Sequence, residues 1–194
     1  MPWVGATQPV PHRPCRVLVA GTSGAGKTTL ARRIATVIGA PHVELDALFH
    51  GPGWVPRPSF LEDVRRFSAA PRWVTEWQYA AARPVLAERA DLVVWLDLPR
   101  AVVMRQVVGR SVVRSVRREV LWNGNVEPPL RSVLTDRDHV VRWAWSRHGR
   151  TARHVTAALE ERPGLAVVRL RRHREARAWL DGPLRAAVAR GDAA

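Results

Sequence analysis

The chain has 194 residues, 46% of them hydrophobic, which is enough for one domain with a sizeable core. No run approaches the ~18 consecutive apolar residues of a membrane span, and the lone cysteine, Cys15, excludes an intrachain disulfide, so we expect a cytoplasmic protein. The formal net charge of +14 is typical of nucleic-acid-binding proteins, but 30 arginines beside one lysine also fit a compositional bias of the genome. The histidines show no zinc-ligand spacing.

The N-terminal part of the chain predicts a strand, a loop and a helix in succession. Residues 1–14 contain four prolines and are expected to form a loose leader. The apolar run 16–20 predicts a buried strand, and apolar residues then recur with helical spacing over 28–38, followed by Gly39 as a C-cap glycine. Between them, Gly21-Thr22-Ser23-Gly24-Ala25-Gly26-Lys27-Thr28 matches the pattern G-x-x-x-x-G-K-[ST] in full.

This segment predicts a phosphate-binding loop (P-loop, Walker A motif). Its glycines permit close approach of the backbone to a ligand, and successive N–H groups at a helix N-terminus attract anions. Lys27 is the only lysine, and its compact ammonium suits a narrow cleft to the β- and γ-phosphates better than a guanidinium. The Thr28 hydroxyl is a candidate ligand for Mg²⁺. The predicted nucleotide-binding residues are Gly21, Thr22, Ser23, Gly24, Ala25, Gly26, Lys27, Thr28, Thr29 and, later in the chain, Arg110.

The rest of the chain alternates between predicted strands and helices. The strands are expected at 42–45, 73–76, 92–96 and 165–170, and the helices at 60–68, 80–90, 101–118, 137–161 and about 173–189. Such alternation indicates βαβ units and a parallel sheet with helices on both faces. We expect one P-loop domain over residues 15–182, with a C-terminal tail over 183–194.

Three carboxylates stand at predicted strand ends, where ligands of parallel sheets bind. Asp46 follows the second strand, Glu76 ends the third and Asp97 follows the fourth. Magnesium with a nucleotide needs an acidic group, usually through water, and the phosphoryl acceptor needs a group that orients or deprotonates it. We assign the metal to Glu76 and the acceptor to Asp46, which makes Asp46 catalytic together with Lys27. The alternative for each, strongest for Asp97, is a carboxylate that caps the following turn.

A stripe of arginines lies on one face of the helix predicted over 101–118, at positions 110, 114, 117 and 118. Three interpretations remain open: a lid that covers the phosphates over about 105–150, a nucleic-acid surface, or a solvated face. Gly109 before Arg110 is a plausible hinge, which favours the lid and a catalytic role for Arg110.

Aromatic residues occur in loops near the predicted active edge. Trp54, Trp77 and Trp122 are placed to stack on a base or another planar substrate, and packing under a loop is the equally good alternative. The predicted acceptor-binding residues are Asp46, Trp54, Trp77 and Tyr79.

Over roughly residues 15–180 the chain resembles the adenylate-kinase-like P-loop kinases, and more narrowly the bacterial subgroup labelled topology modulation protein or adenylate-kinase-related. The resemblance depends on the P-loop, on Leu45-Asp46-Ala47-Leu48-Phe49 followed by Pro52-Gly53-Trp54, on Trp73-Val74-Thr75-Glu76 with Tyr79, and on Trp95-Leu96-Asp97-Leu98-Pro99-Arg100. It implies a three-layer α/β P-loop NTPase fold with a five-stranded parallel sheet of order 2-3-1-4-5 and a helical lid region.

The resemblance also carries residue roles. Glu76 matches the acid that helps to hold Mg²⁺, and Gly109-Arg110 is similar to the Gly-Arg that opens the lid. The chain departs from adenylate kinases at the end of the third strand, where Glu76-Trp77-Gln78-Tyr79-Ala80 stands in place of Asp-Gly-Phe-Pro-Arg and the arginine that grips AMP is missing.

We therefore expect an ATP- and Mg²⁺-dependent phosphotransferase with a small acceptor other than AMP. The alternatives are a regulatory ATPase and a nucleic-acid-associated NTPase.

Overall fold

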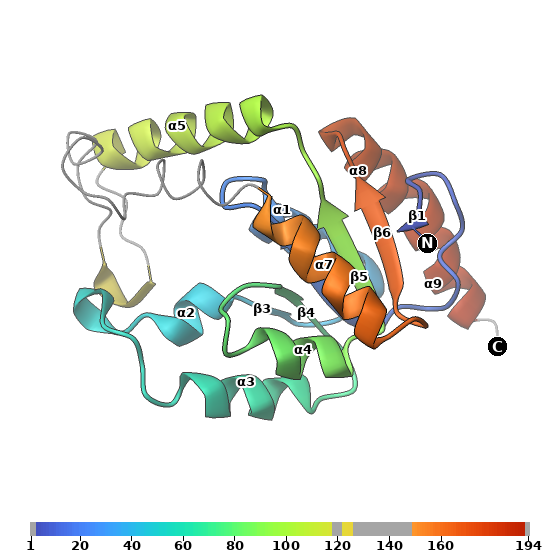
Figure 1. Ribbon diagram of the computed structural model, residues 1–194, viewed down its shortest axis with the longest axis horizontal. Coiled ribbons are helices and arrows are strands. Elements are labelled where there is room, and N and C mark those ends of the chain that lie inside the picture. Colours follow the sequence, from blue (N-terminus) through green and yellow to red (C-terminus); the bar gives the residue numbers. More distant parts are fainter. Residues whose placement is uncertain (1–2, 118–121, 126–148, 193–194) are drawn as a thin grey trace.

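The computed structural model describes residues 3–117, 122–125 and 149–192 and shows a parallel six-stranded sheet between two layers of helices (Figure 1). The strand order is β1-β6-β5-β2-β4-β3, and every pairing is parallel. The strands are β1 (Trp3–Val4), β2 (Arg16–Gly21), β3 (His42–Val43), β4 (Trp73–Glu76), β5 (Leu92–Leu96) and β6 (Ala166–Leu170).

The α-helices are α1 (Lys27–Ile38), α2 (Leu45–Phe49), α3 (Phe60–Ser68), α4 (Arg83–Arg89), α5 (Arg100–Arg117), α7 (Arg150–Glu161), α8 (His173–Trp179) and α9 (Arg185–Asp192). Short 3-10 turns occur at η1 (Pro52–Trp54) and η2 (Trp122–Gly124), and a π-helical turn, η4 (Leu180–Leu184), joins α8 to α9. No described helix combines the length and the apolar character that crossing a membrane requires.

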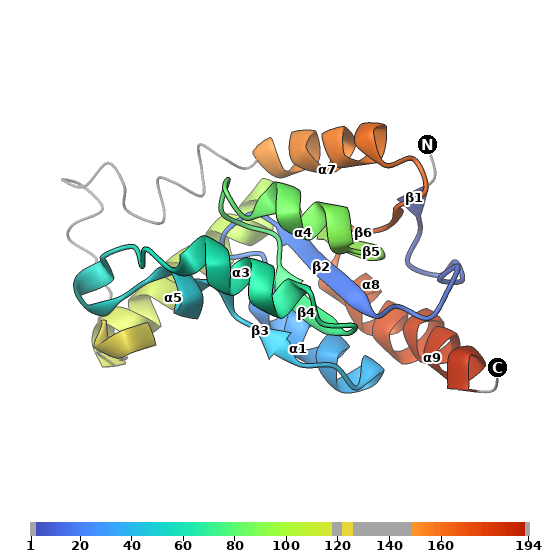
Figure 2. The ribbon, with the colours of Figure 1, turned by 90° about the horizontal axis from the view of Figure 1, so that it is seen from below.

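Alternation along the buried strands divides the core into two parts. Val17 and Val19 of β2 pack with α1, α5, α8 and α9, whereas Leu18 and Ala20 pack with α3, α4 and α7 on the other face. Figure 2 shows these two helical layers with the sheet between them. The predictions for residues 60–68, 73–76 and 92–96 are confirmed as α3, β4 and β5. The two packed faces hold the carboxyl edge of the sheet in place.

The sheet differs from the predicted five strands in order 2-3-1-4-5, because β1 adds a sixth strand beside β6. The five strands after β1 are ordered β3-β4-β2-β5-β6. Trp3 pairs with Val167, its ring lies 5.4 Å from the ring of Trp95, and the Arg169 guanidinium lies 4.7 Å from the same Trp95 ring. These long-range contacts hold a segment that was expected to be a loose leader.

The two chain ends are packed against each other. Val10 is 1% exposed, and Arg190 of α9 donates to its carbonyl oxygen at 2.9 Å. Leu184 and Ala187 are also buried in the core. Over residues 3–14 the expectation of a loose leader is therefore wrong, and residues 183–192 of the segment expected as a tail contribute to the core.

Two further expectations are corrected by the local structure. The second strand stops at Val43, and the apolar run that follows is the short helix α2, so Asp46 lies in a first helical turn. Gly109 lies inside the continuous helix α5 and is not a hinge between elements. The later part of the expected lid, 118–121 and 126–148 with Arg118, and the side chains of Arg114 and Arg117, lie outside the described residues.

Candidate functional site

The loop between β2 and α1 has the backbone geometry of an anion-binding turn. Gly24 and Gly26 adopt φ angles of +81° and +89°, and the Ala25 N–H donates to the Thr22 carbonyl at 3.0 Å. Gly26 is the N-cap of α1 and no side chain caps the helix. The first-turn N–H groups of α1 therefore point to where a ligand anion would lie.

Gly24 also marks a close approach between this loop and α5. A Cβ atom at Gly24 would lie 2.1 Å from Cγ2 of Val107, and the positive φ adds strain for any residue with a side chain. We expect Gly24→Ala to lower the free energy of unfolding by about 2 kcal/mol, measured by denaturant titration. Gly109→Ala is the matched control, because no atom of the described residues, apart from the backbone of the same helical segment, lies within 4 Å of its added Cβ, and alanine favours a helix. Equal stability of Gly24→Ala and the unmodified protein would contradict the contact.

Lys27 interacts electrostatically with charged side chains from three other elements and donates a hydrogen bond within the P-loop. Its Nζ donates to the carbonyl oxygen of Thr22 at 3.3 Å. Burial lowers the pKa of Lys27, the charges of Asp46 and Glu76 oppose this shift, and the charge of Arg110 adds to it. The structure thus brings together the predicted residues of the P-loop, α2, β4 and α5.

Glu76 ends β4 and pairs in register with Val19 of β2, the strand that leads into the P-loop. Its side chain is buried, and Oε1 lies 3.2 Å from Nε2 of His42. Its other oxygen, Oε2, is buried and has no hydrogen-bond partner among the described residues. A buried carboxylate oxygen without a partner costs free energy unless a cation or a bound water meets it.

Asp46 accepts two hydrogen bonds on the same oxygen. Gln78 Nε2 donates to Oδ1 at 2.7 Å, and the Tyr79 hydroxyl donates to it as well. The hydroxyl also lies 3.2 Å from Nε2 of His50. Burial, followed by the charge of Asp46 and the hydrogen bond to it, raises the pKa of Tyr79, so this hydroxyl stays protonated.

Half-buried rings form a wall beside Asp46. Tyr79 stacks on Phe49 with 4.2 Å between ring centroids, and His50 contacts Trp54 edge-on at 5.0 Å. Trp122 stacks against His50 at 6.4 Å. We call this set of rings the aromatic wall: Phe49, His50, Trp54, Tyr79 and Trp122.

The segment 122–125 is held against this wall by Asn125, which is 5% exposed. Its Oδ1 accepts from the Trp54 N–H at 3.0 Å, and its Nδ2 donates to the Gly51 carbonyl at 2.9 Å. Trp122 also donates through Nε1 to Glu44 at 2.9 Å.

Two candidates do not belong to this site. Trp77 is 8% exposed within the core, and its Nε1 donates to the Arg83 carbonyl at 3.2 Å, so the prediction that it contacts substrate is wrong. Asp97 accepts from Arg169 Nε at 2.8 Å, which agrees with a structural role.

A cavity of about 350 Å³ lies beside the first turn of α1, between α5 and α8. Gln106 and His173 line it, with 2.6 Å between their Nε2 atoms, and Gln106 Oε1 is buried without a partner among the described residues. The lining also includes two cationic side chains, Arg33 and Arg177, and four apolar ones, namely Leu30, Leu96, Ala176 and Leu180.

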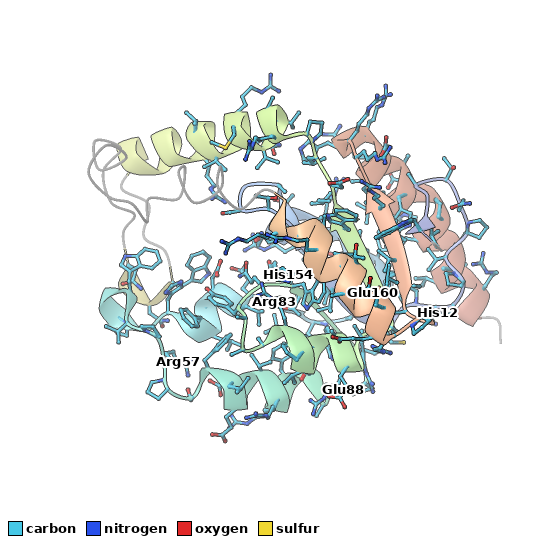
Figure 3. All side chains as sticks on the ribbon, viewed as in Figure 1. His12, Arg57, Arg83, Glu88, His154 and Glu160 are labelled. Carbon is cyan, nitrogen blue, oxygen red and sulfur yellow. The ribbon has the colours of Figure 1, made fainter. Side chains whose placement is uncertain are left out.

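Cationic side chains also gather between α4 and α7. Burial lowers the pKa of His154, and the charges of Arg83, Arg153 and Arg150 lower it further. Figure 3 shows Arg83 and His154 side by side. Both helices begin at the carboxyl edge of the sheet, so this charge attracts anions toward the same edge as Lys27.

Sequence reasoning missed His42, His50, Gln78, Gln106 and His173. Gln78 and His173 follow strand ends closely, and His50 stands four residues after Asp46, which are the positional signals that were available. No pattern pairs Gln106 with His173, because they are 67 residues apart.

No protein-family model matches the chain. Among curated proteins, the ATPase subunit HslU of an ATP-dependent protease from Lactobacillus acidophilus is 36% identical over 81 residues. That match covers 40% of this chain and 17% of the relative's length.

The solved structures to which the chain is similar include two kinases. A gluconokinase from Sinorhizobium meliloti 1021 is 19% identical with a TM-score of 0.49, covering 94% of this chain and 99% of that one. A shikimate kinase from Bacteroides thetaiotaomicron is 16% identical with a TM-score of 0.45, covering 87% and 95%. Likenesses of this level leave the activity to be inferred from the chain's own residues.

Proposed function

We propose that the chain is an ATP-dependent phosphotransferase that transfers the γ-phosphate to a hydroxyl of a small acceptor. The observation that carries the proposal is the environment of Lys27, whose P-loop ammonium lies within the electrostatic reach of Asp46, Glu76 and Arg110. Phosphoryl transfer depends on positioning and on charge stabilisation more than on covalent chemistry, and this group of side chains supplies both.

On the nucleotide side, the P-loop N–H groups and Lys27 hold the β- and γ-phosphates. The cavity beside Gly26 and Thr29 takes the nucleoside, since its volume of about 350 Å³ falls in the range of small-molecule sites. Arg110 of α5 stabilises charge on the phosphoryl group in transfer.

Magnesium, which accompanies ATP, would be held by Thr28 and, through water, by Glu76. The partnerless Oε2 of Glu76 fits this role. The described residues contain no group of three or more His, Cys, Asp or Glu side chains that could bind a metal by themselves. The ion would neutralise phosphate charge.

We expect Glu76→Gln to raise the Mg²⁺ concentration for half-maximal ATP turnover by roughly 10-fold or more. The amide keeps the shape of the side chain but loses the charge that attracts a hydrated cation. Glu88→Gln is the matched control, because Glu88 is exposed on α4, away from the P-loop (Figure 3). An unchanged Mg²⁺ requirement in Glu76→Gln would remove Glu76 from the metal site.

On the acceptor side, Asp46 takes the acceptor's proton, and the half-buried rings of Trp54 and Tyr79 contact its body. The wall contains polar edges beside apolar faces, which suits a hydroxylated molecule with one apolar face.

A panel of nucleosides, sugars, polyols and hydroxy acids tests the proposal through stimulated ADP release, with mass spectrometry of the product. At least one class should accelerate ADP release and become phosphorylated, and Lys27→Ala should abolish the effect. Slow hydrolysis that no panel member stimulates would favour a regulatory ATPase instead.

A nucleic-acid-associated NTPase is the second candidate, favoured by the net charge of +14 and the cations between α4 and α7. It requires binding that weakens steeply as salt rises. If DNA and RNA change neither electrophoretic mobility nor hydrolysis at low salt, this candidate fails.

A further inference from the structure

We propose that Tyr79 and His50 are positioning residues for the transfer reaction. They form a hydrogen-bonded chain, from His50 through Tyr79 to Asp46, that fixes which carboxylate oxygen faces the acceptor. The inference rests on the proposed function and adds two residues that act through Asp46.

The chemistry of the three side chains decides which of them donates and which accepts in each hydrogen bond. A carboxylate only accepts, so the single Tyr79 hydroxyl proton goes to Oδ1 of Asp46. Tyr79 must then accept from the ring of His50, which carries its proton on Nε2. Gln78 donates to the same Oδ1 at 2.7 Å. Two donors therefore engage Oδ1 and leave Oδ2 for the acceptor.

The transfer step balances with Oδ2 as the base. The acceptor oxygen bonds to the γ-phosphorus, and the bond from that phosphorus to the β,γ-bridging oxygen breaks, leaving its electron pair on ADP. The acceptor's proton passes to Oδ2 and from there to solvent.

Backbone contacts hold Tyr79 and His50, the two residues that lead to Asp46 in the hydrogen-bonded series. Tyr79 adopts φ +61°, a conformation rare for residues with a side chain, and its carbonyl accepts from the N–H groups of Ala82 and Arg83 at 3.1 Å each. His50 closes α2 through its N–H, which donates to the Asp46 carbonyl at 3.0 Å. Strained backbone that neighbouring contacts hold in place is typical of preorganised sites.

The test compares Tyr79→Phe, His50→Leu, His50→Gln and the double variant Tyr79→Phe/His50→Leu. The readouts are kcat and KM for Mg·ATP, with the best acceptor of the panel or, where none exceeds it, with water as the acceptor. We expect Tyr79→Phe and His50→Leu to lower kcat by about 10- to 100-fold, with KM for ATP within about twofold. The glutamine side-chain amide can donate in place of Nε2–H, so His50→Gln should retain most of the activity.

The double variant decides whether His50 acts through Tyr79. In that case His50→Leu has no further effect once the hydroxyl is gone, so the double variant is no slower than the slower single variant. His12→Leu and His12→Gln are matched controls, because His12 lies near Asp91 at the other end of the sheet (Figure 3).

Independent effects of the two substitutions, an equal loss in His50→Gln, or a normal kcat in Tyr79→Phe would overturn the inference. A loss of ATP affinity in proportion to kcat would do the same, because it indicates a structural defect. Lys27→Ala separates the two failures: if it abolishes turnover while Tyr79→Phe is normal, only this inference fails. If Lys27→Ala keeps normal turnover, the proposed function fails with it.

Discussion

Lys27→Ala is expected to lower Mg·ATP turnover by about 1,000-fold or more. The substitution removes the only ammonium at the P-loop, and no other lysine exists in the chain to replace it. Without that ammonium, the negative charges of Asp46 and Glu76 are no longer offset at the site, and they repel the phosphates of an incoming nucleotide. Both ground-state binding and stabilisation of the transferring phosphoryl group should therefore suffer.

The fold should survive this substitution. The Nζ of Lys27 donates a 3.3 Å hydrogen bond to the Thr22 carbonyl oxygen, and burial of its charge is itself unfavourable. We expect the free energy of unfolding to change by about 1 kcal/mol or less. Arg66→Ala is a suitable control for the loss of a cation, because Arg66 is exposed on α3 and pairs with Glu62.

Lys27→Arg sharpens the test, because it keeps the charge but replaces a compact ammonium with a planar guanidinium. We expect it to remain inactive. An amine-reactive ATP analogue adds a direct readout, since only Nζ of Lys27 and the N-terminal amine can react. Normal turnover in Lys27→Ala, or labelling that spares Lys27, would count against the nucleotide site.

The parts of the fold that the sequence predicted well are those with local signals. The strand at 92–96 is a continuous apolar run, and the strand at 73–76 is buried along its whole length, because both faces of a parallel sheet are covered. The P-loop was recognisable because its glycines serve a local backbone geometry. The pairing of Trp3 with β6 depends on Trp95 and Arg169, which are distant in the sequence, so no local pattern predicts it.

The candidate site also contains features that local sequence signals predicted and features that they did not. Asp46 was predicted from an expected strand end, whereas it lies on α2, because a short apolar run is compatible with either element. Trp77 was expected to face a ligand, but its side chain packs in the core while the next two residues turn toward Asp46. The conformation of the turn after a strand decides which residue faces a ligand. Here Tyr79 adopts the left-handed conformation although it is not a glycine, so no local sequence signal predicts this turn.

Asp46→Asn is the second substitution with a large expected effect. The asparagine has the same shape and can still accept from Gln78 and Tyr79 through Oδ1, so the hydrogen bonds at that oxygen persist. What it lacks is a basic oxygen for the acceptor's proton. We expect phosphoryl transfer to fall by about 100- to 10,000-fold, while affinity for ATP stays the same or rises, because a negative charge near the phosphates is removed.

The measurement pairs transfer kinetics with ATP binding by calorimetry, and Asp97→Asn is the matched control. Asp97 also follows a strand, β5, but its carboxylate is paired with Arg169. Its amide variant should therefore transfer phosphate normally and lose only some stability. If both variants transfer normally, Asp46 is not the base. If both lose transfer, the effect reflects the carboxyl edge of the sheet in general. Loss in Asp46→Asn alone, with ATP still bound, assigns the proton to the carboxylate that His50 and Tyr79 hold in place.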